Sequence, residues 1–346
     1  MPDFTPGETG TDEVLFAQDG VLGRVLLNRP RAINSLTREM VRAVRARLET
    51  WADDDAVSVV SIEGAGERGL CAGGDIRAVR EAHLAGTTGG VDFWADEYVL
   101  DAQIAEYPKP VIAVMDGIVM GGGLGISMFA DARWVTERSK VAMPETRIGF
   151  FPDVAATYLL SRAPGELGTH MALTGTTITG ADAVHVGLAD SVIDSTSVPD
   201  LLAEVADGRP VEAVATGAAG DEGSLLAPAR GWIDECYASD DPAAILERLR
   251  AHPHQDARAA AVEIAARSPL SVAVTLEALR RAADARSVRE VLETDTTVSA
   301  RLLERADFTE GVRAQLVDKD RSPTWEHARL DEVTREEVLA LFAAAR

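Results

Sequence analysis

Apolar positions in the first half of the chain alternate between strand-like and helix-like spacing. The apolar runs at residues 14–18 and 21–27 flank Asp19-Gly20, a strong signal for the turn of a β-hairpin. The same spacing rules give three further elements: a helix over 37–51 and strands over 57–63 and 111–114. Because strands alternate with helices, we predict an α/β fold.

The pattern changes after about residue 202, where Ala, Leu, Arg and Glu dominate. Helical spacing recurs in three segments, 243–250, 270–283 and 335–345. Thr334 and Glu337 stand in the positions of a capping box for the last of these helices. Small residues at 216–224 predict a surface loop.

Three regions along the chain follow from these patterns. We expect a flexible N-terminus at residues 1–12, an α/β core that carries the functional site at 13–200, and a mainly helical C-terminal region at 201–346.

The charge balance narrows the choice of partners. The 346 residues include 34 basic and 56 acidic side chains, which gives a formal net charge of −22. Such a surface repels nucleic acid and anionic membranes, so we expect neither as a partner. The first residues lack an apolar run, and the apolar stretch 111–130 contains Asp116 and five glycines. We therefore predict a soluble, cytoplasmic protein in which this stretch is a buried strand, turn and helix.

The chain has two cysteines, Cys71 and Cys236, and no CxxC motif or Cys/His cluster. A disulfide scaffold and a zinc site are therefore not expected, and no motif for a redox cofactor is present. Cys71 lies beside a glycine cluster, but no neighbour in sequence would activate it as a nucleophile. We interpret it as a packing residue.

Two glycine-rich segments, 71–77 and 117–125, each follow a predicted strand. If each opens a helix, its backbone N–H groups point outward with partial positive charge. Two such groups converging from separate loops would form an oxyanion hole for an acyl carbonyl. For one loop alone, tight packing of a helix on a strand is an equally good explanation.

A third segment, 142–154, places Glu145 and Asp153 in an apolar stretch bent by proline and glycine. Carboxyl groups among apolar neighbours tend to have raised pKa values, which suits acid–base chemistry. From the charge pattern alone, helix capping or a surface position is the better explanation.

Taken together, these segments resemble the crotonase superfamily, and more narrowly its 3-hydroxyisobutyryl-CoA hydrolase branch. The resemblance rests on LNRPRAINSL, CAGGDIRAV, KPVIAVMDGIVMGGGLGIS and AMPETRIGFFPDV, in that order. It continues through LTGTTITGADAVHVGLAD and, towards the C-terminus, SPLSVAVTLEAL and DFTEGVRAQLVDKDRSPTW, which are the segments most typical of the hydrolase branch. It implies a spiral of ββα units with C-terminal helices covering the site.

The resemblance also implies roles for residues of the two glycine segments. The backbone N–H groups of Gly74 and Gly122 would form the oxyanion hole for the thioester carbonyl. The residues that would hold the coenzyme A portion are Arg31, Ala32, Gly73, Asp75 and Gly121.

The carboxylates match the hydrolase branch better than the hydratases. Hydratases of this superfamily use two glutamates; the second is present as Glu145, whereas Gly125 occupies the first position. Asp153 replaces the usual glycine of hydratases, and Glu97 matches a substrate-contacting position of the hydrolase branch. The branch usually has glycine after Pro-Asp-Val, where this chain has Ala155 followed by another alanine.

The implied activity is hydrolysis of a short β-hydroxyacyl-CoA, most simply 3-hydroxyisobutyryl-CoA in valine breakdown, with coenzyme A as part of the substrate and no further cofactor. A hydratase or isomerase of the same superfamily and a non-catalytic acyl-CoA-binding protein are the alternatives. Crotonases often form trimers or hexamers, and an extended C-terminal region can instead leave a monomer.

Overall fold

The computed structural model describes residues 3–7, 9–214 and 222–343. They form two compact units whose segments alternate along the sequence. The first, here called the sheet unit, comprises Met1–Asp75, Ala95–Val141 and Ile178–Leu225. The second, the helical unit, comprises Ile76–Trp94, Ala142–Thr177 and Leu226–Arg346. Each compact unit thus contains segments that are distant in sequence. The boundary predicted at residue 200 falls inside the sheet unit's segment Ile178–Leu225.

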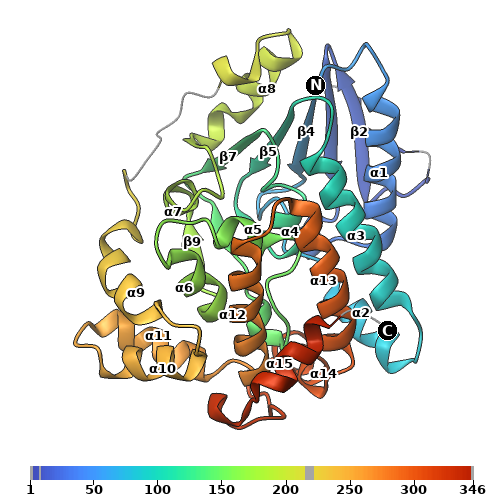
Figure 1. Ribbon diagram of the computed structural model, residues 1–346. Coiled ribbons are helices and arrows are strands. Elements are labelled where there is room, and N and C mark those ends of the chain that lie inside the picture. Colours follow the sequence, from blue (N-terminus) through green and yellow to red (C-terminus); the bar gives the residue numbers. More distant parts are fainter. Residues whose placement is uncertain (1–2, 8, 215–221, 344–346) are drawn as a thin grey trace. The chain divides into compact units, whose positions relative to one another are not determined.

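The sheet unit is built on a seven-stranded mixed sheet (Figure 1). In spatial order its strands are β1 (Thr5–Pro6), β2 (Val14–Asp19), β3 (Leu22–Leu27), β4 (Val59–Gly64), β5 (Val111–Met115), β7 (Ala132–Thr136) and β10 (Ser191–Ile193). The first three pair antiparallel, and the remaining pairs are parallel. Strands alternating with helices therefore produce the α/β organisation that the apolar spacing predicts.

The hairpin predicted at Asp19-Gly20 is confirmed, because Asp19 pairs with Leu22 and Gly20 takes a φ of +54° in the turn. The predicted first helix is also confirmed as α1 (Arg38–Ala52), in which Thr37 accepts a hydrogen bond from the Met40 N–H at 3.2 Å. The apolar face of α1 is buried, as its spacing requires.

One face of the sheet forms a continuous apolar core with α8 (Val198–Ala206). Leu22, Val59, Ile112 and Trp134 contribute from four strands and pack against Val205 and its neighbours on α8. A smaller sheet consists of β6 (Ile118–Met120), β8 (Lys140–Ala142) and β9 (Ile178–Thr179). Along the chain, β6 is followed by α4 (Gly122–Gly125) and β9 by α7 (Gly180–His185). The C-terminal part of α3 (Gly89–Ala105) also belongs to the sheet unit.

The helical unit contains α2 (Ile76–Leu84), the 3-10 helix η2 (Glu145–Ile148), α5 (Ala156–Leu160), α6 (Leu167–Thr174), α9 (Arg230–Tyr237), α10 (Pro242–Ala251), α11 (Gln255–Ala265), α12 (Pro269–Ala283), α13 (Val288–Leu303), α14 (Ala306–Val312) and α15 (Arg335–Phe342). The short helix α5 packs against both α12 and α13 (Figure 1). The helices predicted over 243–250 and 270–283 are confirmed as α10 and α12.

The capping prediction for α15 is half correct. Thr334 accepts a hydrogen bond from the Glu337 N–H at 3.1 Å, as expected of the N-cap. The Glu337 carboxylate does not complete the box; it contacts Arg305 and His327 instead. A cation close in space therefore outcompetes the local backbone group. Helix α15 ends at Phe342 and Ala343 is extended, so the helix is shorter than the predicted 335–345. Most of the loop predicted at 216–224 lies outside the described residues.

Within the segment predicted to be flexible, Thr5 and Pro6 pair with Phe16 and Leu15 as strand β1. Among the described helices, none is by itself long and apolar enough to cross a membrane. The pair α11 and α12 passes on length and composition together, but it is bent by 113°.

Candidate active site

The two glycine segments predicted to act together lie side by side in the sheet unit. The Cys71 N–H donates to the Ile118 carbonyl at 3.1 Å, and the Met120 N–H donates to the Cys71 carbonyl at 3.0 Å. These bonds join the first glycine loop (residues 71–75) to the second (residues 117–122). Gly73 has a φ of +102° and Gly121 a φ of +52°, which a residue with a Cβ adopts only at a cost.

The N–H groups of Gly74 and Gly122 lie next to each other. Leu36 donates to the Gly73 carbonyl at 2.8 Å and accepts from Asp75 at 2.9 Å, so the Gly74 N–H between them points away from Leu36. The Gly74 nitrogen is 3.4 Å from the position that a Cβ on Gly122 would occupy. Gly122 is the first residue of α4, where an N–H has no acceptor within the helix. This arrangement matches that of an oxyanion hole.

Glu97, the predicted substrate-contacting carboxylate, lies against Gly122. Its side chain comes from α3 and is only 2% exposed. A Cβ added to Gly122 would overlap Glu97 Oε1. The sheet unit therefore brings three predicted residues, Gly74, Gly122 and Glu97, into one place.

Cys71 has the environment of a packing residue. The side chain is fully buried, and burial raises the pKa of its thiol to about 12, with a further contribution from the negative charge of Glu97. The sulfur accepts a hydrogen bond from the Gly73 N–H at 3.4 Å. The thiol stays protonated at neutral pH, which agrees with the interpretation of Cys71 as structural.

Two of the residues predicted to hold coenzyme A lie on a segment beside the first glycine loop, which itself contains Gly73 and Asp75. Arg31 and Ala32 are exposed on a short 3-10 helix, η1 (Pro30–Ala32). The next residue, Ile33, accepts a hydrogen bond from Ala72 at 2.9 Å. The carboxylate of Asp75 accepts from Arg29 Nη2 at 3.1 Å, so Asp75 ties the loop to this segment.

Asn34 is not among the predicted site residues, yet it organises this region. Its side chain is fully buried and its φ is +53°. The amide accepts from the Arg29 N–H at 2.9 Å and donates to the carbonyls of Ala65 and Gly69 at 3.1 and 3.0 Å. Asparagine tolerates this backbone region better than most residues, which is the one signal that the sequence offered.

We expect Asn34→Ala to lower the free energy of unfolding by about 3 kcal/mol, because one buried and two partly buried backbone groups lose their partner. Urea denaturation measures this loss. Asn28→Ala is the matched control, since Asn28 makes a single exposed hydrogen bond to the Asp12 carbonyl. If the two variants lost equal stability, Asn34 would not have the organising role described.

In the helical unit, Glu145 begins η2 and is 7% exposed. Its carbonyl accepts the Phe150 N–H at 3.1 Å, which closes the turn. The Phe150 ring stacks on Trp94 with centroids 4.7 Å apart and packs against Phe308 at 5.6 Å. The predicted catalytic carboxylate is thus held by a turn that is anchored in an aromatic cluster.

Asp153 precedes α5 in the same unit and is 5% exposed. The next two residues, Val154 and Ala155, have φ values of +52° and +57°. This explains why glycine would suit the position after Pro-Asp-Val: the backbone is left-handed there, and alanine pays about 1 kcal/mol or more for it. The effect of Ala155 is therefore on backbone strain in the turn that carries Asp153.

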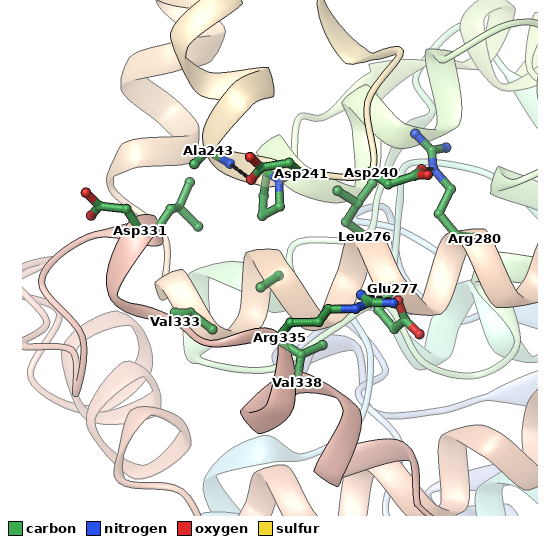
Figure 2. A pocket seen from close by; sticks show the side chains of 13 residues that line it. Asp240, Asp241, Ala243, Leu276, Glu277, Arg280, Asp331, Val333, Arg335 and Val338 are labelled. Carbon is green, nitrogen blue, oxygen red and sulfur yellow. Dashed lines mark hydrogen bonds and ion pairs between the residues drawn. The ribbon is translucent and has the colours of Figure 1, made fainter.

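A cavity of about 500 Å³ lies elsewhere in the helical unit (Figure 2). Arg280 pairs there with Asp240 at 2.9 Å, and Arg335 pairs with Glu277 at 2.5 Å. Figure 2 shows these two ion pairs among the lining side chains. None of the predicted site residues is among the described residues that line this cavity.

Glu326, His327 and Glu337 are close enough together to offer ligand atoms to a metal ion. Arg305 already bridges the two carboxylates and offsets part of their negative charge. The prediction that the protein needs no cofactor beyond coenzyme A stays a prediction.

Comparison with known proteins identifies the family. Residues 22–342 match the family model described as enoyl-CoA hydratase/isomerase. The chain is 38% identical to the mitochondrial 3-hydroxyisobutyryl-CoA hydrolase of Rattus norvegicus over 96% of this chain and 89% of the relative.

Two solved structures are also close. One, described as a carnitinyl-CoA dehydratase from Mycobacterium thermoresistibile, has a TM-score of 0.92 with 46% identity, and 97% of each chain is covered. The other, described as an enoyl-CoA hydratase from Rhodobacter sphaeroides, has a TM-score of 0.91 with 39% identity over 96% of this chain and 97% of the other. Both confirm the predicted crotonase fold. The chain therefore belongs to the enoyl-CoA hydratase/isomerase family, that is, the crotonase superfamily, in its 3-hydroxyisobutyryl-CoA hydrolase branch.

Proposed function

We propose that the protein hydrolyses a short β-hydroxyacyl-CoA thioester, 3-hydroxyisobutyryl-CoA, to 3-hydroxyisobutyrate and coenzyme A. The observation that carries the proposal is the pair of N–H groups at Gly74 and Gly122 with the Glu97 carboxylate beside them. Two donors placed together favour an acyl oxygen on which negative charge develops. The name of the rat relative supports hydrolysis as the reaction.

The two donors would bind the thioester oxygen, and each is typically worth about 3 kcal/mol in the transition state. Glu145 then has two possible routes. As a general base, it accepts a proton from water while the water oxygen bonds to the acyl carbon; the C–S bond then breaks and the proton passes to the leaving thiolate. As a nucleophile, its oxygen bonds to the acyl carbon and expels coenzyme A, and water cleaves the mixed anhydride.

Asp153 and Glu97 are proposed to bind the β-hydroxyl of the acyl group. Both carboxylates are almost fully buried, so a hydroxyl donor would interact with them strongly. This role would account for a preference for hydroxyacyl over plain acyl thioesters.

Hydration is the alternative that the two solved structures raise, since one is described as a dehydratase and the other as a hydratase. Gly125 argues against it, because the position assigned to the first glutamate of hydratases carries no side chain here. A non-catalytic acyl-CoA-binding protein would have no use for two buried carboxylates, Glu145 and Asp153, each of which costs stability to bury.

Asp153→Asn is expected to lower kcat/KM for 3-hydroxyisobutyryl-CoA by about 30-fold, since a hydrogen bond to a charged group is lost. For isobutyryl-CoA, which lacks the hydroxyl, we expect a loss of about threefold or less. Both values come from the rate of thiol release. Equal losses for the two substrates would argue against hydroxyl binding by Asp153.

We also propose that the reaction serves valine breakdown, that coenzyme A enters only as part of the substrate, and that the protein works in the cytoplasm. The rat relative is described as mitochondrial, so localisation by a fluorescent fusion is the direct check. Assembly as a trimer or hexamer, or a monomeric state, is decided by light scattering.

A further inference from the structure

A buried carboxyl group in the helical unit holds the turn that carries Asp153. Asp295 lies on α13 and is 1% exposed. Its Oδ2 accepts the Ala155 N–H at 2.8 Å, a bond between residues 140 positions apart in sequence. Asp295 therefore connects α13 to the N-terminal end of α5.

The hydrogen bond from Ala155 to Asp295 forms at a strained part of the backbone. Ala155 is the N-cap residue of α5 and is in the left-handed region, and an alanine side chain has no acceptor with which to cap the helix. Val154, which is β-branched, has the same unfavourable sign of φ. Such strain persists only when surrounding contacts fix the turn. Asp295 provides one of these contacts from outside the segment.

Asp295 also lies close enough to Asp153 for the two charges to interact. Burial raises the pKa of Asp295 well above its usual range, and the negative charge of Asp153 raises it further. Within the described chain, Asp295 Oδ1 has no hydrogen-bond partner, which a buried carboxylate would tolerate poorly. A neutral acid fits these observations better than a carboxylate, and its Oδ2 still accepts the Ala155 N–H.

We propose that Asp295 is a positioning residue, which fixes the turn at residues 153–155 and so orients the Asp153 carboxylate towards the hydroxyl of the substrate. This proposal rests on the proposed function, which identifies that hydroxyl as the one on the acyl group. The hydrogen bond to Ala155 requires an acceptor at residue 295 and no charge.

The first test is rescue by the isosteric amide. Asp295→Ala is expected to lower the ratio of kcat/KM for 3-hydroxyisobutyryl-CoA to that for isobutyryl-CoA by about tenfold, because Ala155 loses its acceptor. Asp295→Asn keeps an acceptor oxygen and should hold the ratio within about threefold of the wild type. A ratio unchanged in Asp295→Ala would overturn the proposal, as would an Asp295→Asn variant as impaired as Asp295→Ala.

Asp307→Ala is the matched control for the loss of a buried carboxyl. Asp307 is 2% exposed, lies on α14 and accepts hydrogen bonds from Ser268 and the Glu326 N–H at 2.5 and 2.7 Å. This variant should lower the melting temperature while keeping the substrate ratio within about twofold, since its hydrogen bonds do not reach Ala155. A tenfold change of the substrate ratio in this control would mean that the loss of any buried carboxyl group alters selectivity. That result would contradict the role assigned to Asp295.

Hydrogen exchange of the Ala155 amide provides a readout that does not depend on turnover. Protection should be present in the wild type and in Asp295→Asn, and should fall at least about tenfold in Asp295→Ala. A wild-type protein that releases no thiol would overturn the proposed function, whereas unchanged protection in Asp295→Ala would overturn the anchoring bond itself. The two failures are therefore distinguishable.

Ala155→Gly completes the set. Glycine adopts the left-handed turn without strain. In a protein that carries Ala155→Gly, the fall in the substrate ratio caused by Asp295→Ala should therefore be about threefold smaller than in the wild type. Full additivity of the two changes would contradict the view that Asp295 acts through Ala155.

Discussion

Glu145→Gln is expected to lower kcat for thioester hydrolysis by about 10³-fold, because the amide neither accepts a proton from water nor attacks the acyl carbon. KM should change by less than about threefold, since the groups assigned to coenzyme A lie on other segments. Stopped-time assays of thiol release give both values. The side chain is isosteric, so the turn closed by Glu145 and Phe150 should survive and the melting temperature should stay close to that of the wild type.

Glu39→Gln is the matched control, since Glu39 is exposed on α1. Its activity should equal that of the wild type. If Glu145→Gln kept more than a tenth of the wild-type kcat, Glu145 would be removed from both proposed routes.

Gly122→Ala is expected to lower kcat/KM by about 10²- to 10³-fold, the loss that accompanies removal of an oxyanion-hole donor. The added Cβ would overlap Glu97 Oε1 and lie 3.4 Å from the Gly74 nitrogen, so α4 or Glu97 must move. Movement of α4 would displace the Gly122 N–H, whereas movement of Glu97 would displace the carboxylate beside the two donors. Steady-state kinetics and a thermal melt separate the catalytic loss from general unfolding.

Gly231→Ala is the control, because the space around this glycine can hold a Cβ. A Cβ there meets no described atom within 4 Å, and alanine is the better helix former in α9. It should keep full activity. Combining Gly122→Ala with Glu97→Ala should recover part of the lost melting temperature, because the overlapping side chain is gone. Full activity of Gly122→Ala would contradict the oxyanion-hole assignment.

Local patterns were enough to predict most of the sheet unit's first elements. The turn at Asp19-Gly20 and the helix after Thr37 depend on neighbours in sequence, and both are where the spacing placed them. The pairing of Cys71 with Val119 is different, because two segments nearly 50 residues apart must meet. Only the family resemblance indicated that the two glycine loops act together.

The roles of Asn34 and Asp295 illustrate what the sequence could not give. Each stabilises a strained turn through hydrogen bonds that form only in the folded chain, and the partner of Asp295 is 140 positions away. Asn34 belongs to the segment LNRPRAINSL but was given no role there, and Asp295 lies outside every segment on which the resemblance rests. Glu337 shows the converse: a local capping pattern was present, but ion pairs with Arg305 and His327 engage its carboxylate.

The interleaving of the two units is also beyond local reasoning. The change in composition near residue 202 marks the start of a helix-rich region, yet the helical unit also takes in residues 76–94 and 142–177. The segment with Glu145 and Asp153 belongs to it, and its Phe150 packs on Trp94 and Phe308, which are in the same unit.

The most direct test of the proposed function is thiol release from 3-hydroxyisobutyryl-CoA, measured beside the loss of conjugated-thioester absorbance of crotonyl-CoA. We predict rapid thiol release and no hydration of crotonyl-CoA, since Gly125 leaves the hydratase position without a side chain. Hydration of crotonyl-CoA without thiol release would contradict the account.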